Sequence, residues 1–193
     1  MDYKLIRTFI AVPVPEPLFN LQEKLKATIS EKTGKIRWLR KDQLHLTLKF
    51  LGDTTEDSIN DVRRIMQNIA DEFKPFNVSI QKTGCFPKIE RPRVMWVGVS
   101  GELAKLDQLV ERIQKKLNPL GFPKDEKKYY PHITIARAKY PQKKTPDIST
   151  FLDTSFDPIP FQIKKVQFIS SELFPNGPVY TILSTHFFGN NSV

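Results

Sequence analysis

The predicted secondary-structure elements follow an order that repeats along the chain. Alternating apolar residues predict one strand around Phe9 and another around Trp96, and helical spacing follows each of them. His45 lies 36 residues after Phe9, and His132 lies 36 residues after Trp96. Because this is the pattern of two copies of one supersecondary unit, we predict two related halves that pack about a pseudo-twofold axis.

Strands and helices are expected along the whole chain, and no low-complexity linker separates them. The expected strands are Thr8–Val12, Leu44–Leu51, Phe76–Thr83, Val94–Val99, Ile133–Ala136, Phe161–Ser170 and Val179–Phe187. The expected helices are Pro15–Ser30, about Glu56–Phe73 and about Glu102–Leu117, each with an apolar stripe. Phe76 and Phe161 open strands 31 and 29 residues after the two histidines, which extends the repeat. We therefore predict one continuous α+β domain over residues 1–193.

Two tetrapeptides of one pattern stand at corresponding places in the repeat. They are His45-Leu46-Thr47-Leu48 and His132-Ile133-Thr134-Ile135, and they contain two of the three histidines of the chain. Because side chains alternate across a strand, each histidine shares a face with its threonine, while the aliphatic residues point to the core. A single histidine on a strand would favour a structural role, but two matched segments indicate a site.

This arrangement suits phosphodiester cleavage by two imidazoles. One imidazole takes a proton from attacking water while the other, protonated, gives one to the leaving oxygen, and imidazole titrates near neutral pH. The hydroxyls of Thr47 and Thr134 can donate to the non-bridging phosphate oxygens. We therefore predict His45, His132, Thr47 and Thr134 as the catalytic residues.

Other chemistries lack their usual sequence features. A catalytic zinc site needs about three protein ligands, and the sequence has no His-Glu-x-x-His motif and no cysteine pair, so no metal and no cofactor are predicted. Cys85, beside Phe86, is interpreted as a buried thiol and not as a nucleophile. His186 matches no motif and is expected to be structural.

The net charge of +9 is concentrated around the two histidine segments. Residues 35–49 contain five cations and one acid, and residues 124–144 contain seven cations and two acids. Solvated charge for solubility remains an alternative, but this placement favours an anionic ligand or a polynucleotide. Lys49 in the first cluster, and Tyr130 beside the lysines of the second, are expected to contact substrate. The single cysteine and the absence of a long apolar segment predict a cytoplasmic protein that does not enter a membrane.

The chain resembles the 2H phosphoesterase superfamily and, within it, the RNA 2',3'-cyclic phosphodiesterases, historically called 2'-5' RNA ligases. Four segments carry the resemblance: Arg7-Thr8-Phe9-Ile10-Ala11-Val12, then Gln43-Leu44-His45-Leu46-Thr47-Leu48-Lys49-Phe50-Leu51-Gly52, then Pro131-His132-Ile133-Thr134-Ile135-Ala136-Arg137, and finally Ser171-Glu172-Leu173 with Gly177-Pro178-Val179-Tyr180. The first three are similar to the opening strand and the two His-x-Thr-x motifs of the family. The fourth is similar to its closing hairpin.

The resemblance implies a bilobal α+β fold with two antiparallel sheets facing each other across a cleft and helices on the outside. It implies hydrolysis of RNA 2',3'-cyclic phosphate ends to 2'-phosphomonoesters, with His45 as proton donor and His132 as proton acceptor. It also implies possible reversible 2'-5' RNA ligation. Arg137 would contact phosphate or the flanking nucleotide. Phe9 would meet the terminal base or pack in the core. We expect a monomer, with tRNA fragments among the possible substrates.

Two other functions remain open from the sequence. A phosphodiesterase for small cyclic nucleotides would process a cyclic mononucleotide far faster than an RNA end. A non-catalytic RNA-binding module would bind RNA in a salt-sensitive manner and would not lose any activity when the histidines are replaced.

Overall fold

Nine antiparallel strands form one strongly curved sheet in the computed structural model, which describes residues 5–29, 34–175 and 177–189. Their order is β7-β4-β5-β6-β3-β1-β8-β9, and β2 pairs with β6 outside this path. The strands are β1 Leu5–Pro13, β2 Ile36–Trp38, β3 His45–Thr55, β4 Phe76–Phe86, β5 Val94–Gly101, β6 His132–Ala138, β7 Ile159–Ile163, β8 Lys165–Phe174 and β9 Gly177–Phe187.

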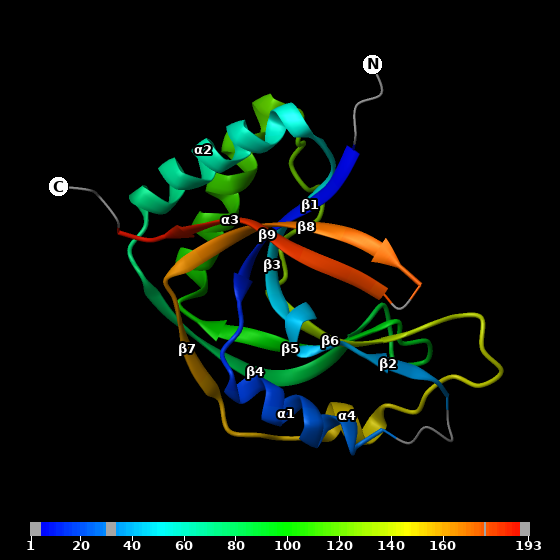
Figure 1. The fold of residues 1–193 in the computed structure, drawn as a ribbon. Coiled ribbons are helices and arrows are strands. Elements are labelled where there is room, and N and C mark those ends of the chain that lie inside the picture. The colour runs from blue at the N-terminus through cyan, green and yellow to red at the C-terminus, as the bar shows by residue number, and fades with distance from the viewer. Residues whose placement is uncertain (1–4, 30–33, 176, 190–193) are drawn as a thin grey trace.

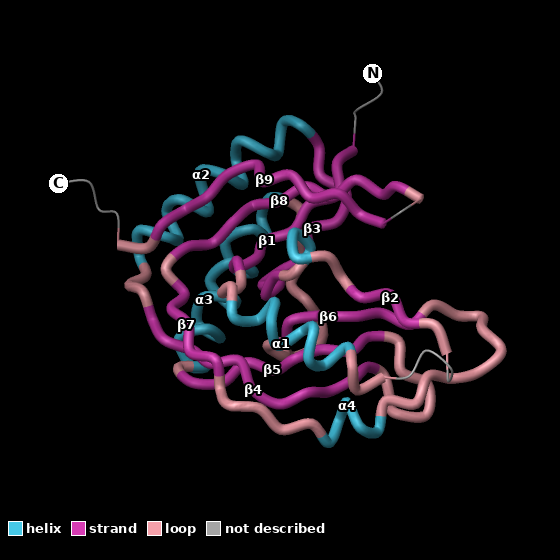
Figure 2. Tube along the Cα trace, turned by 60° about the horizontal axis from the view of Figure 1, so that its bottom comes forward, coloured by secondary structure: helices cyan, strands magenta, loops and turns pink. Residues whose placement is uncertain are grey.

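The sheet consists of two four-stranded halves that meet at its centre. One half is β3-β1-β8-β9 and the other is β6-β5-β4-β7, and Figures 1 and 2 show them on opposite sides of the molecule. They join between β3 and β6, where Leu46 pairs with Ile133. The α+β, antiparallel, bilobal prediction is confirmed, and the two expected sheets are continuous through this junction. Both histidines begin the central strands.

The downstream part of the expected repeat is wrong at Phe161. Phe76 opens β4 and Phe161 lies in β7, and these strands pair with each other inside one half. They are neighbours in the sheet and not counterparts. From the strand order, the counterpart of β4 is β8, because each is the third strand from the centre.

The helices cover the convex side of the sheet. They are α1 Pro17–Lys26, α2 Glu56–Glu72, α3 Leu103–Leu117 and the short α4 Ser149–Asp153, with 3-10 turns at Lys41–Gln43 and Asn118–Leu120. The apolar stripes predicted from the sequence are buried, as Leu18, Met66 and Leu109 illustrate with no exposed area. The main core therefore lies between the helices and the sheet. No helix within the described ranges is long and apolar enough to cross a membrane.

Some expected boundaries differ from the structure, and two short elements were missed. The segment expected as one strand, Phe161–Ser170, is divided between β7 and β8 at Lys164. The first helix ends at Lys26, and Ser30 lies outside the described residues. The sequence analysis missed β2 and α4, which have three and five residues, because such short elements carry too little periodicity.

Irregular pairing follows both His-x-Thr-x motifs at equivalent positions. In β3 the pairing with β1 skips Leu48, because Ala11 pairs with Thr47 and Ile10 pairs with Lys49. In β6 the pairing with β5 skips Ile135 in the same way. A bulge shifts the alternation of side chains by one residue. The residues five positions after each histidine, Phe50 and Arg137, therefore become exposed.

Candidate active site

The two motifs line one small cavity between the halves of the sheet. Its volume is about 140 Å³, and His45, Thr47, His132 and Thr134 are all among its lining residues. The aliphatic residues between them, such as Leu46 and Ile133, are completely buried on the other face. The cavity is thus built as the alternation predicted, with one His-Thr pair from each half.

His45 sits among aromatic rings. Its ring centroid is 4.7 Å from that of Phe9 and 5.4 Å from that of Tyr180. The pKa of His45 falls to about 4, mainly because the imidazole is buried. The charges of Arg137 and His132 lower this pKa further, and a hydrogen bond with the backbone of Gln43 opposes the shift. His45 is therefore neutral at pH 7 in the free protein.

His132 is oriented by the chain that precedes it. Its Nδ1 lies 2.7 Å from the carbonyl oxygen of Tyr130. Because a carbonyl can only accept, Nδ1 carries the proton and Nε2 is left to exchange one with substrate. The ring of Phe86 contacts it edge-on at 5.0 Å between centroids. Burial lowers the pKa of His132, and the charge of Arg137 lowers it further. The hydrogen bond with the Tyr130 carbonyl acts in the opposite direction and raises it.

Arg137 and Phe50 reach the cavity because of the two bulges. Both line it, and both lie five residues after a histidine. Strict alternation would have turned each of them toward the core. Arg137 was predicted through the family resemblance alone, and Phe50 was missed because its neighbours in the sequence do not reveal the bulge at Leu48.

The position of Lys49 contradicts the prediction that it contacts substrate. After the bulge, Lys49 pairs with the fully buried Ile10 and points to the core face. Its Nζ donates to the carbonyl oxygen of Pro123 at 2.7 Å and pairs with Asp125 at 3.3 Å. With its side chain 1 % exposed, the ammonium holds the 123–125 segment and does not face the cavity.

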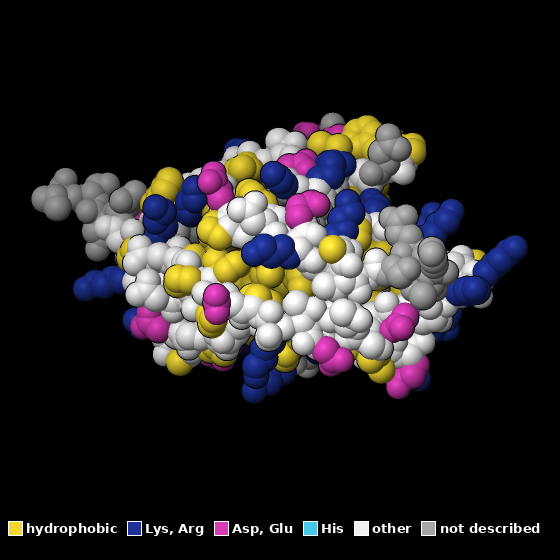
Figure 3. Space-filling model, turned by 90° about the horizontal axis from the view of Figure 1, so that it is seen from below, with side chains coloured by type: hydrophobic (Ala, Val, Ile, Leu, Met, Phe, Trp, Pro, Cys, Tyr) yellow, Lys and Arg dark blue, Asp and Glu magenta, His cyan; other side chains and the backbone are white. Residues whose placement is uncertain are grey.

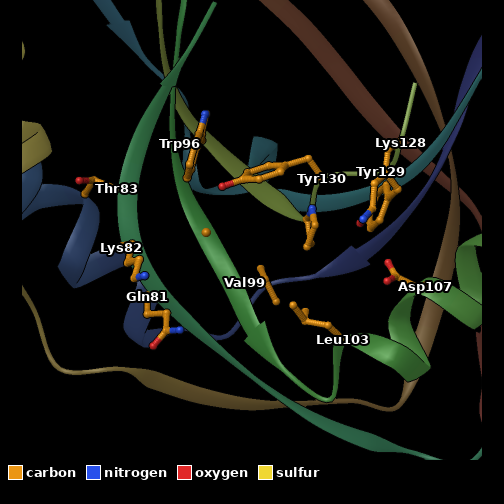
Figure 4. A pocket seen from close by; sticks show the side chains of 12 residues that line it. Gln81, Lys82, Thr83, Trp96, Val99, Leu103, Asp107, Lys128, Tyr129 and Tyr130 are labelled. Atoms are coloured by element: carbon orange, nitrogen blue, oxygen red, sulfur yellow. The ribbon is translucent and has the colours of Figure 1, made fainter. Parts of the chain in front are cut away.

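The predicted contact residues Phe9 and Tyr130 lie beside the two histidines. Phe9 is 3 % exposed and packs against His45 and Tyr180, in a small buried cluster that is separate from the main core. Tyr130 is 54 % exposed, and its ring centroid is 6.4 Å from that of His132. With Trp96 it lines a neighbouring pocket of about 450 Å³ that also includes Lys82 (Figure 4). None of the residues that line this pocket also lines the histidine cavity.

Two hydrogen bonds hold the site strands in place. The hydroxyl of Tyr129 donates to the carbonyl oxygen of Thr47 at 2.9 Å, which ties the segment before His132 to β3 of the other half. The side chain of Gln22 on α1 donates to the carbonyl oxygen of Ile135, the bulged residue of β6, at 3.0 Å. Sequence patterns did not predict either hydrogen bond.

The remaining candidates lie away from the cavity. His186 lies on β9, with hydrogen bonds to Ser184 of the same strand and to Gln67 of α2. No histidine is visible on the face drawn in Figure 3. Burial raises the pKa of the Cys85 thiol, which is the opposite of what an activated nucleophile needs. Within the ranges that the structure describes, no group of three or more His, Cys, Asp or Glu side chains could hold a metal ion.

Comparisons with known proteins agree with this geometry. Residues 14–173 match the model of the 2'-5' RNA ligase superfamily. An RNA 2',3'-cyclic phosphodiesterase of Aquifex aeolicus is 32% identical over 96% of this chain and 99% of its own length. One of Methanocaldococcus jannaschii is 32% identical over 92% of this chain and 98% of its own.

Solved structures have the same fold. The crystal structure of TT0787 of Thermus thermophilus covers 96% of this chain and 100% of its own, with a TM-score of 0.80 and 28% identity. The apo structure of E. coli LigT covers 96% of this chain and 98% of its own, with a TM-score of 0.73 and 20% identity, and supports the fold alone. The resemblance stated from the motifs is confirmed, and the chain belongs to the 2'-5' RNA ligase superfamily.

Proposed function

We propose that this protein hydrolyses RNA 2',3'-cyclic phosphate ends to 2'-phosphomonoesters. The observation that carries the proposal is the single cavity lined by both histidines and both threonines, which come from equivalent strands of the two halves. Relatives over nearly the whole chain are named RNA 2',3'-cyclic phosphodiesterase, which supports the same reaction class.

In the proposed reaction, water attacks the phosphorus in line with the departing 3'-oxygen. His132 takes a proton from the water through Nε2, as its Nδ1 is held by the Tyr130 carbonyl. His45 gives a proton to the 3'-oxygen as the bond between phosphorus and that oxygen breaks. The products are a 2'-phosphomonoester and a free 3'-hydroxyl. The hydroxyls of Thr47 and Thr134 and the guanidinium of Arg137 stabilise the added negative charge.

The donor role of His45 depends on the substrate's charge. In the free protein burial holds its pKa at about 4, so the imidazole is neutral at pH 7. The anionic cyclic phosphate placed beside it favours the imidazolium and raises this pKa. Substrate binding and protonation of His45 are therefore coupled, and turnover is expected to fall as the pH rises above the pKa of the complex.

The activity is tested with a short oligonucleotide that carries a 2',3'-cyclic phosphate end, in the presence of EDTA. We expect a 2'-phosphate product from the wild-type protein. We also expect a loss of about 10² to 10⁴ in rate for His45→Ala and for His132→Ala, the range typical of one acid or base role. Absence of turnover by the wild-type protein rejects the proposal, and dependence on added metal rejects the two-histidine mechanism.

The two roles are separated by a substrate with sulfur in place of the bridging 3'-oxygen. A thiolate leaves without a proton, so the rate lost in His45→Ala should return with this substrate, while that of His132→Ala should stay low. If the substrate restored the rate of His132→Ala and not that of His45→Ala, His132 would be the proton donor and His45 the proton acceptor.

Ligation and cellular setting extend the same proposal. An RNA 5'-hydroxyl that replaces the attacking water would form a 2'-5' linkage through the same acid-base steps. The cytoplasmic location, the monomeric state and the use of tRNA fragments stay predictions.

A further inference from the structure

We infer that the protein selects RNA ends over cyclic mononucleotides through a second pocket, which binds the phosphodiester and base on the 5' side of the terminal nucleotide. This inference rests on the proposed function. The pocket has a volume of about 410 Å³ and is lined by Arg7, Arg37, Arg137, Phe50 and Tyr180 among others; we call it the arginine pocket.

The arginine pocket adjoins the histidine cavity. Phe50, Arg137 and Tyr180 line both. The other large pocket near the site, lined by Trp96 and Tyr130, shares no lining residue with that cavity. A chain that extends from a phosphate bound between the histidines therefore has the arginine pocket as its adjoining space.

Three arginines reach this pocket from three different strands without an acidic partner. Arg7 is on β1, Arg37 on β2 and Arg137 on β6, and none of the residues that line the pocket is acidic. In the described part of the chain the arginine ion pairs are those of Arg40, Arg64 and Arg112. Asp53 lies opposite Arg7 in the β1–β3 register but forms no ion pair with it. In these ranges none of the three arginines forms an ion pair, so their guanidinium groups are available to an anion.

The register of β2 and β6 adds an independent sign of an anion site. Arg37 pairs directly with Arg137 across the two strands. Like charges directly opposite each other disfavour the pairing of two strands, and an anion bound between or above the two guanidinium groups would remove that cost. A phosphodiester provides that anion, and guanidinium binds its two oxygens in a matched geometry.

A base-stacking surface lies in the same pocket. Phe50 is 65% exposed, although it is a large apolar side chain, and its ring centroid is 6.0 Å from that of Phe9. Gly52, two residues further on β3, has a φ of +75° and no atoms near its missing side chain, which leaves room beside the ring. Exposed aromatic rings next to cations are typical of single-stranded nucleic-acid sites.

The direction of the RNA follows from the proposed reaction. The departing 3'-oxygen belongs to the terminal ribose, so this ribose lies on the side of His45. Phe9 and Tyr180, which contact the His45 ring, both line the arginine pocket. The 5' side of the terminal nucleotide therefore points into the arginine pocket, where the preceding phosphodiester meets Arg7 and Arg37.

The test compares three substrates that share the same reacting end: a 2',3'-cyclic mononucleotide, a dinucleotide with a 2',3'-cyclic end, and that dinucleotide with a neutral methylphosphonate linkage. For the wild-type protein we expect kcat/KM to be about tenfold or more higher for the natural dinucleotide than for the other two, the size of one charge-assisted hydrogen bond. Arg7→Ala and Arg37→Ala should each reduce this preference. Arg64→Ala removes an arginine from α2, outside the pocket, and should leave it unchanged.

The outcomes separate this inference from the proposed function. Hydrolysis of all three substrates at similar kcat/KM overturns the inference and leaves the proposed function in place. Turnover of none of them removes both. If an arginine variant fails to fold, the methylphosphonate comparison on the wild-type protein still decides. A preference that survives in both arginine variants, or falls equally in Arg64→Ala, also counts against the arginine pocket.

Discussion

Replacement of Tyr129 by phenylalanine should loosen the active site without changing the volume of the core. The only atom removed is the hydroxyl oxygen, which donates to the carbonyl oxygen of Thr47 at 2.9 Å. Tyr129 is partly buried, and burial raises the pKa of its hydroxyl above its usual range, so the hydroxyl remains a donor near neutral pH. A net hydrogen bond contributes about 0.5–1.5 kcal/mol, and an unpaired buried acceptor costs about 1–3 kcal/mol.

We therefore expect Tyr129→Phe to lower the free energy of unfolding by about 1–2 kcal/mol, which for a chain of this length lowers Tm by about 2–8 °C. Because the bond ties the segment before His132 to the strand that carries Thr47, kcat should also fall, on the order of tenfold. Calorimetry and steady-state hydrolysis of a cyclic-ended oligonucleotide measure the two effects.

Tyr140→Phe is the matched control. The hydroxyl of Tyr140 is buried and has no hydrogen-bond partner among the described residues. Its removal should leave Tm unchanged or slightly raised and should not alter kcat. If the two variants shift Tm by the same amount, or if Tyr129→Phe keeps full kcat, the reasoning about this bond between the halves is refuted.

Three further predictions concern single side chains. The pKa of His45 is about 4 in the folded protein and about 6.5 in the unfolded chain, so the unfolded state binds more protons between these values. Stability should fall by about 3 kcal/mol as the pH drops from 6.5 to 4, and urea titrations of His45→Gln should show a flatter dependence. Cys85→Ser should retain turnover, because burial keeps the thiol protonated, and loss of activity on this change would contradict its assignment. Lys49→Met should leave KM for the cyclic-ended oligonucleotide unchanged, since the ammonium contacts Pro123 and Asp125. A large rise in KM would show instead that Lys49 contacts the substrate.

Periodicity was sufficient to predict the elements that are long and regular. The stripes of the three long helices and the alternation within each His-x-Thr-x motif predicted which side chains would be buried. The matched placement of His45 and His132 also predicted that they come from equivalent strands, and both do begin the central strands of the two halves. These features depend on local spacing, which a sequence displays directly.

The register of the strands, and which strands pair with each other, could not be predicted from spacing. The bulges at Leu48 and Ile135 invert the alternation just after each motif, so Lys49 turns inward and Phe50 turns outward. Nothing in the order of apolar and polar residues marks an unpaired residue in a strand. The pairing of β2 with β6, which brings Arg37 beside Arg137, joins segments about a hundred residues apart and has no local signal.

The central claim is that His45 and His132 act on one phosphate in one displacement. It is tested most directly by single-turnover rates for His45→Ala, His132→Ala and the double variant on one cyclic-ended oligonucleotide. Groups that act as a unit show losses that do not multiply, so the double variant should be about as slow as the slower single variant. Full multiplication of the two losses would mean that the histidines act independently, and unchanged turnover in the double variant would contradict the account altogether.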